Sequence, residues 1–347
     1  MQYFTRLILL LIVIVGNIIL LSSYIPYNRH LQANATSTSK TIPFIASVDT
    51  MKESRDTQTH PLSDITIAQD VNLSTSLHTT HITVDTNWDY EEYFRRWAKA
   101  IHTAGKHIWV RGHPNKWENN NQAMGIMTTK EYETYERNFI LRNADVFASG
   151  DIFDPCSEPE QGHYWKSTYP VWNATTTIEY NRFLRDSTDV ANTAFAEKGV
   201  TGVVTTIHST NAWMARHRLE KETIAKMGVV TIDSYPDQYD TSVAKAVADR
   251  LNEIAAVHNA VHVPIILGEI GYSNKIQVSD QNQKDVLQAE FNAIRQLSYI
   301  AGANYWVSAG GPGHGGYTNI FTGSAGKWKL RPAALTLDSL FQSEGSQ

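Results

Sequence analysis

The sequence of 347 residues contains 30 basic and 35 acidic side chains, which give a net charge of −5, and 42% of its residues are hydrophobic. A chain of this size and composition can bury a large core, which excludes a disordered or collagen-like protein. The mild acidity argues against a nucleic-acid-binding protein, and the single cysteine excludes an intrachain disulfide framework and a Cys-cluster zinc site.

The chain begins with an apolar segment. Residues 7–21 are almost entirely apolar, with Asn17 as the polar interruption. This run is short for a membrane-spanning helix, which needs roughly 20 residues, but typical of the hydrophobic region of a signal peptide. We expect residues 1–27 to be a signal peptide or signal anchor and residues 28–40 a polar linker, with residues 41–347 forming one domain outside the cytoplasm. A retained anchor would be the only membrane contact.

Short runs rich in Val, Ile and Thr recur from residue 41 onwards and predict strands that are buried on both faces of a parallel sheet. The predicted strands are Pro43–Asp49, His81–Thr86, His107–Gly112, Asp151–Cys156, Gly202–His208, Val229–Ser234, Val263–Glu269 and Ala303–Ser308. Segments with helical spacing of apolar residues lie between them, at Glu91–Ala104, Tyr132–Leu141, Glu179–Ala196, Asp240–His258 and Lys284–Ile300. This alternation predicts an α/β fold, a (β/α)8 TIM barrel preceded by the N-terminal hydrophobic segment. The alternative is an open doubly wound sheet, but no glycine-rich nucleotide-binding motif follows a predicted strand.

The residues that end the predicted strands are polar, titratable or aromatic. They are Asp49, Asp85, Arg111, His113, Ser157, Glu158, His208, Asn211, Asp233, Tyr235, Glu269 and Trp306. In (β/α)8 barrels the active site lies at the C-terminal ends of the strands. Because a purely structural barrel end would carry turn-forming residues instead, this set predicts a functional site.

Two glutamates in this set suggest a chemistry. Glu269 ends the most apolar strand, where a carboxylate is costly to bury unless it is paired or solvated, and Glu158 follows the fourth strand, with Glu160 as its nearest competitor. Two glutamates that face each other at about 5–5.5 Å suit retaining glycoside hydrolysis. The alternatives are a salt bridge at the barrel rim for Glu269 and a surface charge for Glu158.

These motifs resemble those of the clan A glycoside hydrolases, the retaining (β/α)8 enzymes that include many cellulases and mannanases. In that clan the acid/base glutamate ends strand four, usually within Asn-Glu-Pro, and Ser157-Glu158-Pro159 is similar to that motif. The segment LGEIGYS around Glu269 resembles the strand that carries the nucleophile. The resemblance implies that Glu158 is the general acid/base and Glu269 the nucleophile.

The same resemblance implies roles in substrate binding. Tyr235 would contact the nucleophile, Trp306 would form the floor of the sugar subsite beside the scissile bond, and His113 is similar to a histidine of strand three. The main departure is Ser157, because the clan usually has an asparagine there that holds the sugar 2-hydroxyl. Asn211 is a candidate for that contact.

Other side chains at the strand ends have two interpretations. Arg111 either keeps a catalytic glutamate ionised or forms a structural ion pair. His113 and His208 either bind substrate hydroxyls or are ordinary hydrogen-bonded histidines, and Asp85 and Asp233 are expected to hold neighbouring groups. Five tryptophans in the predicted loops are candidates for stacking on sugar rings, of which we expect one or two to do so: Trp88, Trp117, Trp165, Trp172 and Trp213.

We therefore predict a glycoside hydrolase that cleaves a β-linked poly- or oligosaccharide without a cofactor. The alternative, motivated by Ser157, is a carbohydrate-binding barrel of the cell envelope that does not cleave its ligand. A metal-dependent hydrolase is a third hypothesis, but no HxH or HxxxH pair lies on a predicted strand, so we predict no metal site. No GxSxG motif indicates a serine hydrolase.

Overall fold

The computed structural model describes residues 44–114, 117, 127–162, 165, 172–236, 242–272, 279–310 and 318–344. The chain divides into two units, residues 1–42 and 43–347, and every described residue belongs to the second. The predicted signal segment and linker therefore lie outside the described residues. Within the described part of the chain, no helix combines the length and apolarity that a membrane crossing requires.

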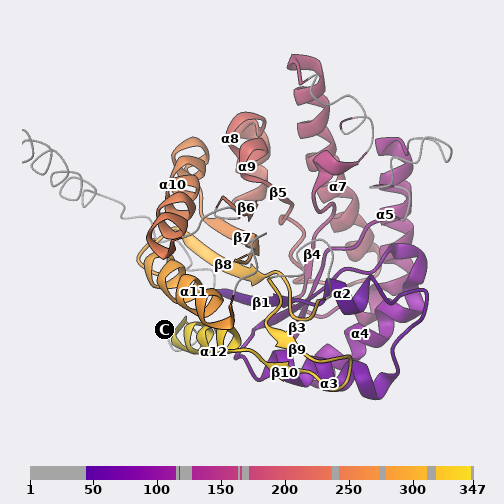
Figure 1. The fold of residues 1–347 in the computed structure, drawn as a ribbon. Helices are drawn as coiled ribbons and strands as arrows, with labels where there is room; N and C mark the ends of the chain where they lie inside the picture. Colours follow the sequence, from indigo (N-terminus) through magenta and orange to yellow (C-terminus); the bar gives the residue numbers. More distant parts are fainter. Residues whose placement is uncertain are drawn as a thin grey trace, which may run out of the picture. The chain divides into compact units, whose positions relative to one another are not determined.

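An eight-stranded parallel sheet forms the centre of the second unit (Figure 1). Its strands are β1 (Ile45–Asp49), β2 (His81–Val84), β3 (His107–Val110), β4 (Ile152–Phe153), β5 (Ser209–Asn211), β6 (Val230–Ser234), β7 (Ile265–Ile270) and β8 (Ile300–Tyr305). Their order is β4-β3-β2-β1-β8-β7-β6-β5, so consecutive strands are neighbours in the sheet except β4 and β5, which lie at its two edges, and β8 pairs with β1. This order excludes a doubly wound sheet.

The two edge strands of this sheet meet through the segment before β5. Val204 forms an isolated parallel bridge with Ile152 of β4. The amide of Phe153 donates to the carbonyl of Val204 at 2.9 Å, and the amide of Val204 donates to the carbonyl of Asp151 at 2.8 Å. The fold is therefore an α/β fold of the TIM-barrel type, as the sequence predicts.

The fifth strand differs from its prediction. The predicted run Gly202–His208 contributes only the Val204 bridge, and the ladder with β6 forms at Ser209–Asn211. The side chains of this run contact helix α7 (Ala174–Glu197) instead, because Thr205 donates to Asn192 and His208 bonds Thr188. Every other predicted strand overlaps an observed one.

Helices lie around the outside of the sheet (Figure 1). The longer ones are α3 (Asp64–Thr75), α4 (Glu91–Thr103), α5 (Thr129–Asn143), α7, α10 (Val243–Val261), α11 (Asp280–Ile294) and α12 (Pro332–Glu344). Shorter ones are α2 (Met51–Ser54), α8 (Ala212–His217) and α9 (Lys221–Met227), with a two-stranded sheet of β9 (Phe321–Thr322) and β10 (Lys329–Leu330). The predicted helix Lys284–Ile300 was placed too late, because Ser279 caps α11 through the amide of Asn282 and Ile300 already begins β8.

An aromatic cluster fills the space between the sheet and helices α4, α5 and α7. Trp88, Trp117 and Trp165 are at most 2% exposed within it. Their rings pack on neighbouring aromatic rings, as in the 4.5 Å contact between Trp117 and Tyr132. These three of the five candidates are therefore core residues, since a core is where such large apolar surfaces are most stable. Trp172 is half-buried and Trp213 is 45% exposed, so both remain candidates for stacking on sugars.

Candidate active site

Glu158 follows β4 in a backbone conformation that few residues other than glycine adopt. Its φ of 45° and ψ of 53° lie in the left-handed region, and it caps the short 3-10 helix Pro159–Gln161. Its amide donates to the carbonyl oxygen of Ser209 at 2.8 Å, which ties the loop to β5. A non-glycine residue in this region costs of order 1–3 kcal/mol, and such costs concentrate at functional sites.

Glu269 lies near the end of β7 and is held by two donors. Arg111, which follows β3, donates to its Oε1 at 2.6 Å, and the hydroxyl of Tyr235, which follows β6, donates to its Oε2 at 3.0 Å. Glu269 is 7% exposed. Each oxygen thus has a separate donor, which fixes the orientation of the carboxyl group.

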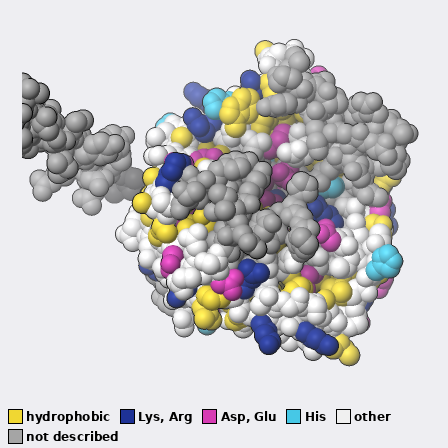
Figure 2. Space-filling model, viewed as in Figure 1, with side chains coloured by type: hydrophobic (Ala, Val, Ile, Leu, Met, Phe, Trp, Pro, Cys, Tyr) yellow, Lys and Arg dark blue, Asp and Glu magenta, His cyan; other side chains and the backbone are white. Residues whose placement is uncertain are grey.

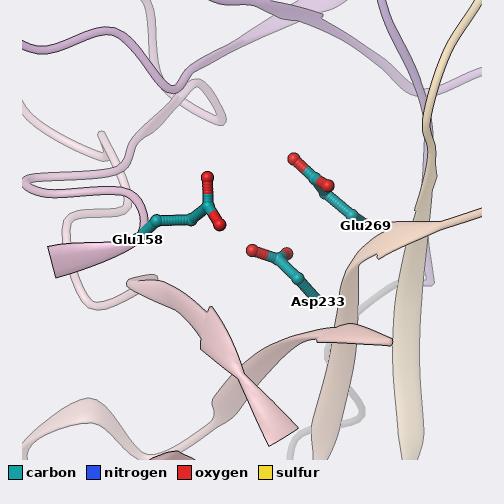
Figure 3. Close-up of side chains that lie close together, drawn as sticks. All are labelled: Glu158, Asp233 and Glu269. Carbon is teal, nitrogen blue, oxygen red and sulfur yellow. The ribbon is translucent and has the colours of Figure 1, made fainter. Parts of the chain in front are cut away.

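Asp233 of β6 is brought to the same place by an irregularity in the sheet. Ile232 is in register with Leu267, but Asp233 is in register with Glu269, so Gly268 has no partner on β6. This bulge makes the two carboxyl groups neighbours, and one oxygen from each of Glu158, Asp233 and Glu269 lies within 4.8 Å of the others (Figure 3). The expectation that Asp233 only holds neighbouring groups missed this position.

Gly268 leaves the space that this arrangement needs. An added Cβ would lie 2.5 Å from the Oγ of Ser209 and 2.9 Å from the Oδ1 of Asp233. No side chain therefore fits there without displacing the neighbours. An isolated glycine inside a strand pattern is a known signal of a bulge or a close approach, and this is the sequence feature that could have indicated the neighbourhood of Asp233 and Glu269.

Arg111 is the cation at the centre of these groups. It is 1% exposed, and besides Glu269 it contacts Asp49 at 3.2 Å and Asp233 at 3.6 Å. Burial lowers its pKa, but Glu269, Asp233 and Asp49 raise it more strongly, so its pKa lies well above the ordinary value. The guanidinium is therefore a permanent positive charge beneath the carboxyl groups.

The acids around Arg111 are perturbed in the opposite sense. Burial raises the pKa of Asp49 to about 6, although Arg111 lowers it. Burial and the charge of Glu269 raise the pKa of Asp233 well above its usual range, and burial followed by the same charge does so for Tyr235. Tyr235 is therefore a neutral hydroxyl donor, and Asp233 tends to keep its proton. Acidic side chains are visible near the centre of the face drawn in Figure 2.

Glu160, the competitor of Glu158, is used in the structure. Its Oε1 accepts from the amide of Asn211 at 2.8 Å and from the Asn211 side chain at 2.6 Å, and its Oε2 accepts from Thr210 at 2.9 Å and lies 3.4 Å from the Tyr180 hydroxyl. Glu160 is thus a brace between the loop after β4 and the start of α8. Asn211 also accepts from the amide of Met214 and caps α8. The structure therefore does not present Asn211 as a group for the sugar.

Trp306, His113 and His208 are the remaining predicted site residues, and the structure places each of them differently. Trp306 is 9% exposed and packs against Tyr235 at 6.2 Å, so it belongs to the site. His113 is buried after β3, with its Nδ1 3.0 Å from the carbonyl of Pro114. His208 is 1% exposed and its Nε2 contacts Thr188 of α7 at 2.8 Å. The structure thus does not bring His208 to the carboxyl groups, because its side chain points toward the helix layer.

The arrangement suits chemistry between two carboxyl groups. The fold is that of the TIM-barrel proteins, and solved structures that share it include glycoside hydrolases. Comparisons with protein-family profiles and with curated protein sequences found no match.

Particular solved structures resemble this chain. GH5_18 from Streptomyces cattleya in complex with GlcNAc superimposes with a TM-score of 0.67 at 15% identity, over 88% of this chain and 81% of that one. GH5_18 from Bifidobacterium longum subsp. infantis gives 0.66 at 14% identity, over 86% and 78%. The exo-β-1,4-mannosidase Op5Man5 from Opitutaceae bacterium strain TAV5 gives 0.65 at 12% identity, over 87% and 60%. At these identities the similarity is one of fold.

Proposed function

We propose that this protein is a retaining glycoside hydrolase in which Glu269 is the nucleophile and Glu158 the general acid/base. The observation that carries the proposal is the close approach of the two glutamates at the ends of β4 and β7, with oxygens within 4.8 Å of each other. Retaining enzymes separate their two carboxyl groups by about 5–5.5 Å, whereas inverting enzymes need about 6.5–9.5 Å to admit a water molecule. The observed approach favours retention.

In the first step an oxygen of Glu269 attacks the anomeric carbon while the bond to the leaving oxygen breaks. Glu158 gives its proton to that oxygen, so the leaving sugar departs as an alcohol and a glycosyl ester forms on Glu269. Arg111 and Tyr235 hold Glu269 in one orientation and stabilise its negative charge before attack.

In the second step a water molecule takes the place of the leaving sugar. Glu158, now ionised, removes a proton from that water, whose oxygen bonds to the anomeric carbon as the ester bond to Glu269 breaks. Both glutamates return to their starting states, and the product keeps the configuration of the substrate.

The expected substrate is a β-linked poly- or oligosaccharide. One structurally similar protein, a variant of GH5_18 from Streptomyces cattleya, is bound to Manβ1-4GlcNAc, and another is an exo-β-1,4-mannosidase. These neighbours support a β-linked pyranoside as the first class to test. The two catalytic carboxyl groups favour cleavage over the alternative of a barrel that only binds carbohydrate.

A second candidate is a metal-dependent hydrolase, because the oxygens of Glu158, Asp233 and Glu269 are close enough to hold one cation. Arg111 opposes this, since its guanidinium lies 2.6 Å from Glu269 and 3.6 Å from Asp233 and would repel a cation bound among the same oxygens. Activity that survives incubation with a chelator is the expected result.

The test uses aryl β-glycosides with a good leaving group. Glu269→Gln should abolish turnover, whereas Glu158→Ala should still form the glycosyl-enzyme and be accelerated by azide, which replaces the missing base with a small nucleophile. NMR of the first product should show the β-anomer. Full activity in both variants, or an α-anomer as first product, contradicts the mechanism.

Glu160→Ala is the matched control for Glu158→Ala. It removes the same carboxyl group two residues away, but from a side chain bonded to Thr210 and Asn211. Its activity should fall without any acceleration by azide. Azide rescue of Glu160→Ala in place of Glu158→Ala would assign the acid/base role to Glu160.

A further inference from the structure

Asp233 is a buried carboxyl group that the double displacement does not use. Its side chain is 6% exposed, and neither of its oxygens accepts a hydrogen bond from the described residues. The nearest cation is Arg111, at 3.6 Å. Burying such a group without hydrogen bonds costs free energy, so a carboxyl group that points into a site and accepts no hydrogen bond there indicates a missing partner (Figure 3).

The position of Asp233 restricts what that partner can be. One of its oxygens lies within 4.8 Å of both glutamates, which flank the anomeric carbon in the proposed reaction. Two ring atoms are bonded to the anomeric carbon. The ring oxygen carries no hydrogen to donate, whereas the neighbouring carbon carries the 2-substituent, which in most sugars is a hydroxyl. The 2-hydroxyl is therefore the sugar group best placed to pair with Asp233.

Two other polar side chains near Glu158 are already engaged. The Oγ of Ser157, which stands where the clan A enzymes usually have asparagine, donates to the backbone carbonyl of Arg111 at 2.8 Å. The side chain of Asn211 donates to Glu160 and accepts from Met214. Of these three candidates, Asp233 alone has oxygens that form no hydrogen bond within the described chain.

We propose that Asp233 binds the 2-hydroxyl of the sugar in the subsite where the bond is cleaved, and so determines specificity at that carbon. The inference rests on the proposed glycosidase function and adds a residue to it. A carboxyl group that keeps its proton both donates to and accepts from a hydroxyl, which suits a contact that strengthens as the transition state forms.

The experiment compares each enzyme on two substrates. Dinitrophenyl β-glucoside and β-mannoside differ only at carbon 2, and both have the same 2-deoxy parent. For each enzyme, kcat/KM on the epimer that the wild type hydrolyses is compared with kcat/KM on the 2-deoxy glycoside. Because the ratio of kcat/KM values is taken on one enzyme sample, the fraction of folded protein cancels.

Asp233→Ala should lower kcat/KM at least about tenfold on the 2-hydroxy substrate and less than about threefold on the 2-deoxy substrate, since tenfold corresponds to about 1.4 kcal/mol, which is what a hydrogen bond between neutral groups contributes at most. Asp233→Asn should recover part of the loss, because its amide still bonds a hydroxyl. Equal losses on both substrates would overturn the proposal and indicate a general electrostatic or structural role.

Glu136→Gln is the control. Glu136 of α5 is also fully buried, and its oxygens accept no hydrogen bond from the described residues, but it is outside the site. Its substrate ratio should equal that of the wild type. Wild-type activity lost to chelator and restored by Mg²⁺ or Mn²⁺ would make Asp233 a metal ligand and overturn the assignment. A wild type inactive on every glycoside would overturn the proposed function itself.

Discussion

Replacement of Arg111 by methionine tests how the charges of the site are balanced. The side chain is 1% exposed and contacts Glu269 at 2.6 Å, Asp49 at 3.2 Å and Asp233 at 3.6 Å. At an effective dielectric constant of about 20, one pair of unit charges about 4 Å apart is worth about 4 kcal/mol, and desolvation offsets much of that. Removing one member of a buried pair costs about 3–5 kcal/mol because the other charge is left uncompensated. We expect Arg111→Met to lose this much stability near neutral pH.

The loss should depend on pH, and the sign follows from Asp49. Its pKa is raised to about 6 although Arg111 lowers it, so without Arg111 the folded variant binds protons more readily. A folded state that binds more protons gains stability as pH falls. The difference between wild type and variant should therefore be smaller at about pH 5 than at about pH 7.5. Urea unfolding followed by tryptophan fluorescence measures it, and a difference under about 1 kcal/mol at both pH values would refute the reasoning.

The same variant should change the pH dependence of activity. Burial raises the pKa values of Asp49 and Asp233 and Arg111 lowers both, so without Arg111 these groups should bind protons at higher pH. The acidic limb of the pH–rate profile should therefore move to higher pH in Arg111→Met. Arg250 is the matched control, because it is equally buried and pairs with Glu290 at 3.3 Å away from the carboxyl cluster. Arg250→Met should destabilise the protein and leave the acidic limb in place.

Two further changes have expected outcomes. Burial lowers the pKa of His208 from 6.5 to about 3. Between pH 6.5 and pH 3 the unfolded chain therefore binds a proton at His208 that the folded protein does not bind. The contribution of His208 to the free energy of unfolding is therefore fully present above pH 6.5 and is lost as the pH falls toward 3. His208→Asn should remove about 2 kcal/mol of the stability difference between about pH 7.5 and pH 5, as measured by urea unfolding, and an unchanged pH dependence would contradict this. Glu160→Gln places an amide where Thr210 and Asn211 donate, so it should cost about 1–3 kcal/mol and lower kcat more than KM changes. Wild-type stability and kcat in Glu160→Gln would show that the brace does not position Glu158.

The sequence predicted most strands of the fold because their chemistry is local. Runs such as Val229–Ser234 and Val263–Glu269 are apolar and β-branched, and a strand buried on both faces requires that composition. The prediction of the fifth strand was wrong because it also relied on local composition. The segment Gly202–His208 has the composition of a strand, but its polar side chains contact α7. Composition does not say which neighbour a segment pairs with.

The candidate site was predicted in part. Arg111, Tyr235 and Trp306 follow strands at positions where side chains of a barrel converge, and the structure brings all three to Glu269 or its neighbourhood. His208 and Asn211 also lie at a strand end, but their side chains bond α7 and Glu160. The order of residues along a chain does not fix which way a side chain points once the ladder has shifted.

The sequence by itself determined the alternation of strands and helices and the position of Glu158 and Glu269 at strand ends. The reason is that the spacing of apolar residues along a short segment predicts both its secondary structure and the side that it buries. Tertiary structure alone decided that Asp233 joins them. That neighbourhood depends on a bulge at Gly268 that shifts β7 against β6 by one residue, and on a guanidinium from β3 that reaches across the barrel. Such contacts arise between segments more than a hundred residues apart, as Arg111 and Glu269 are, and only the packed sheet brings them together.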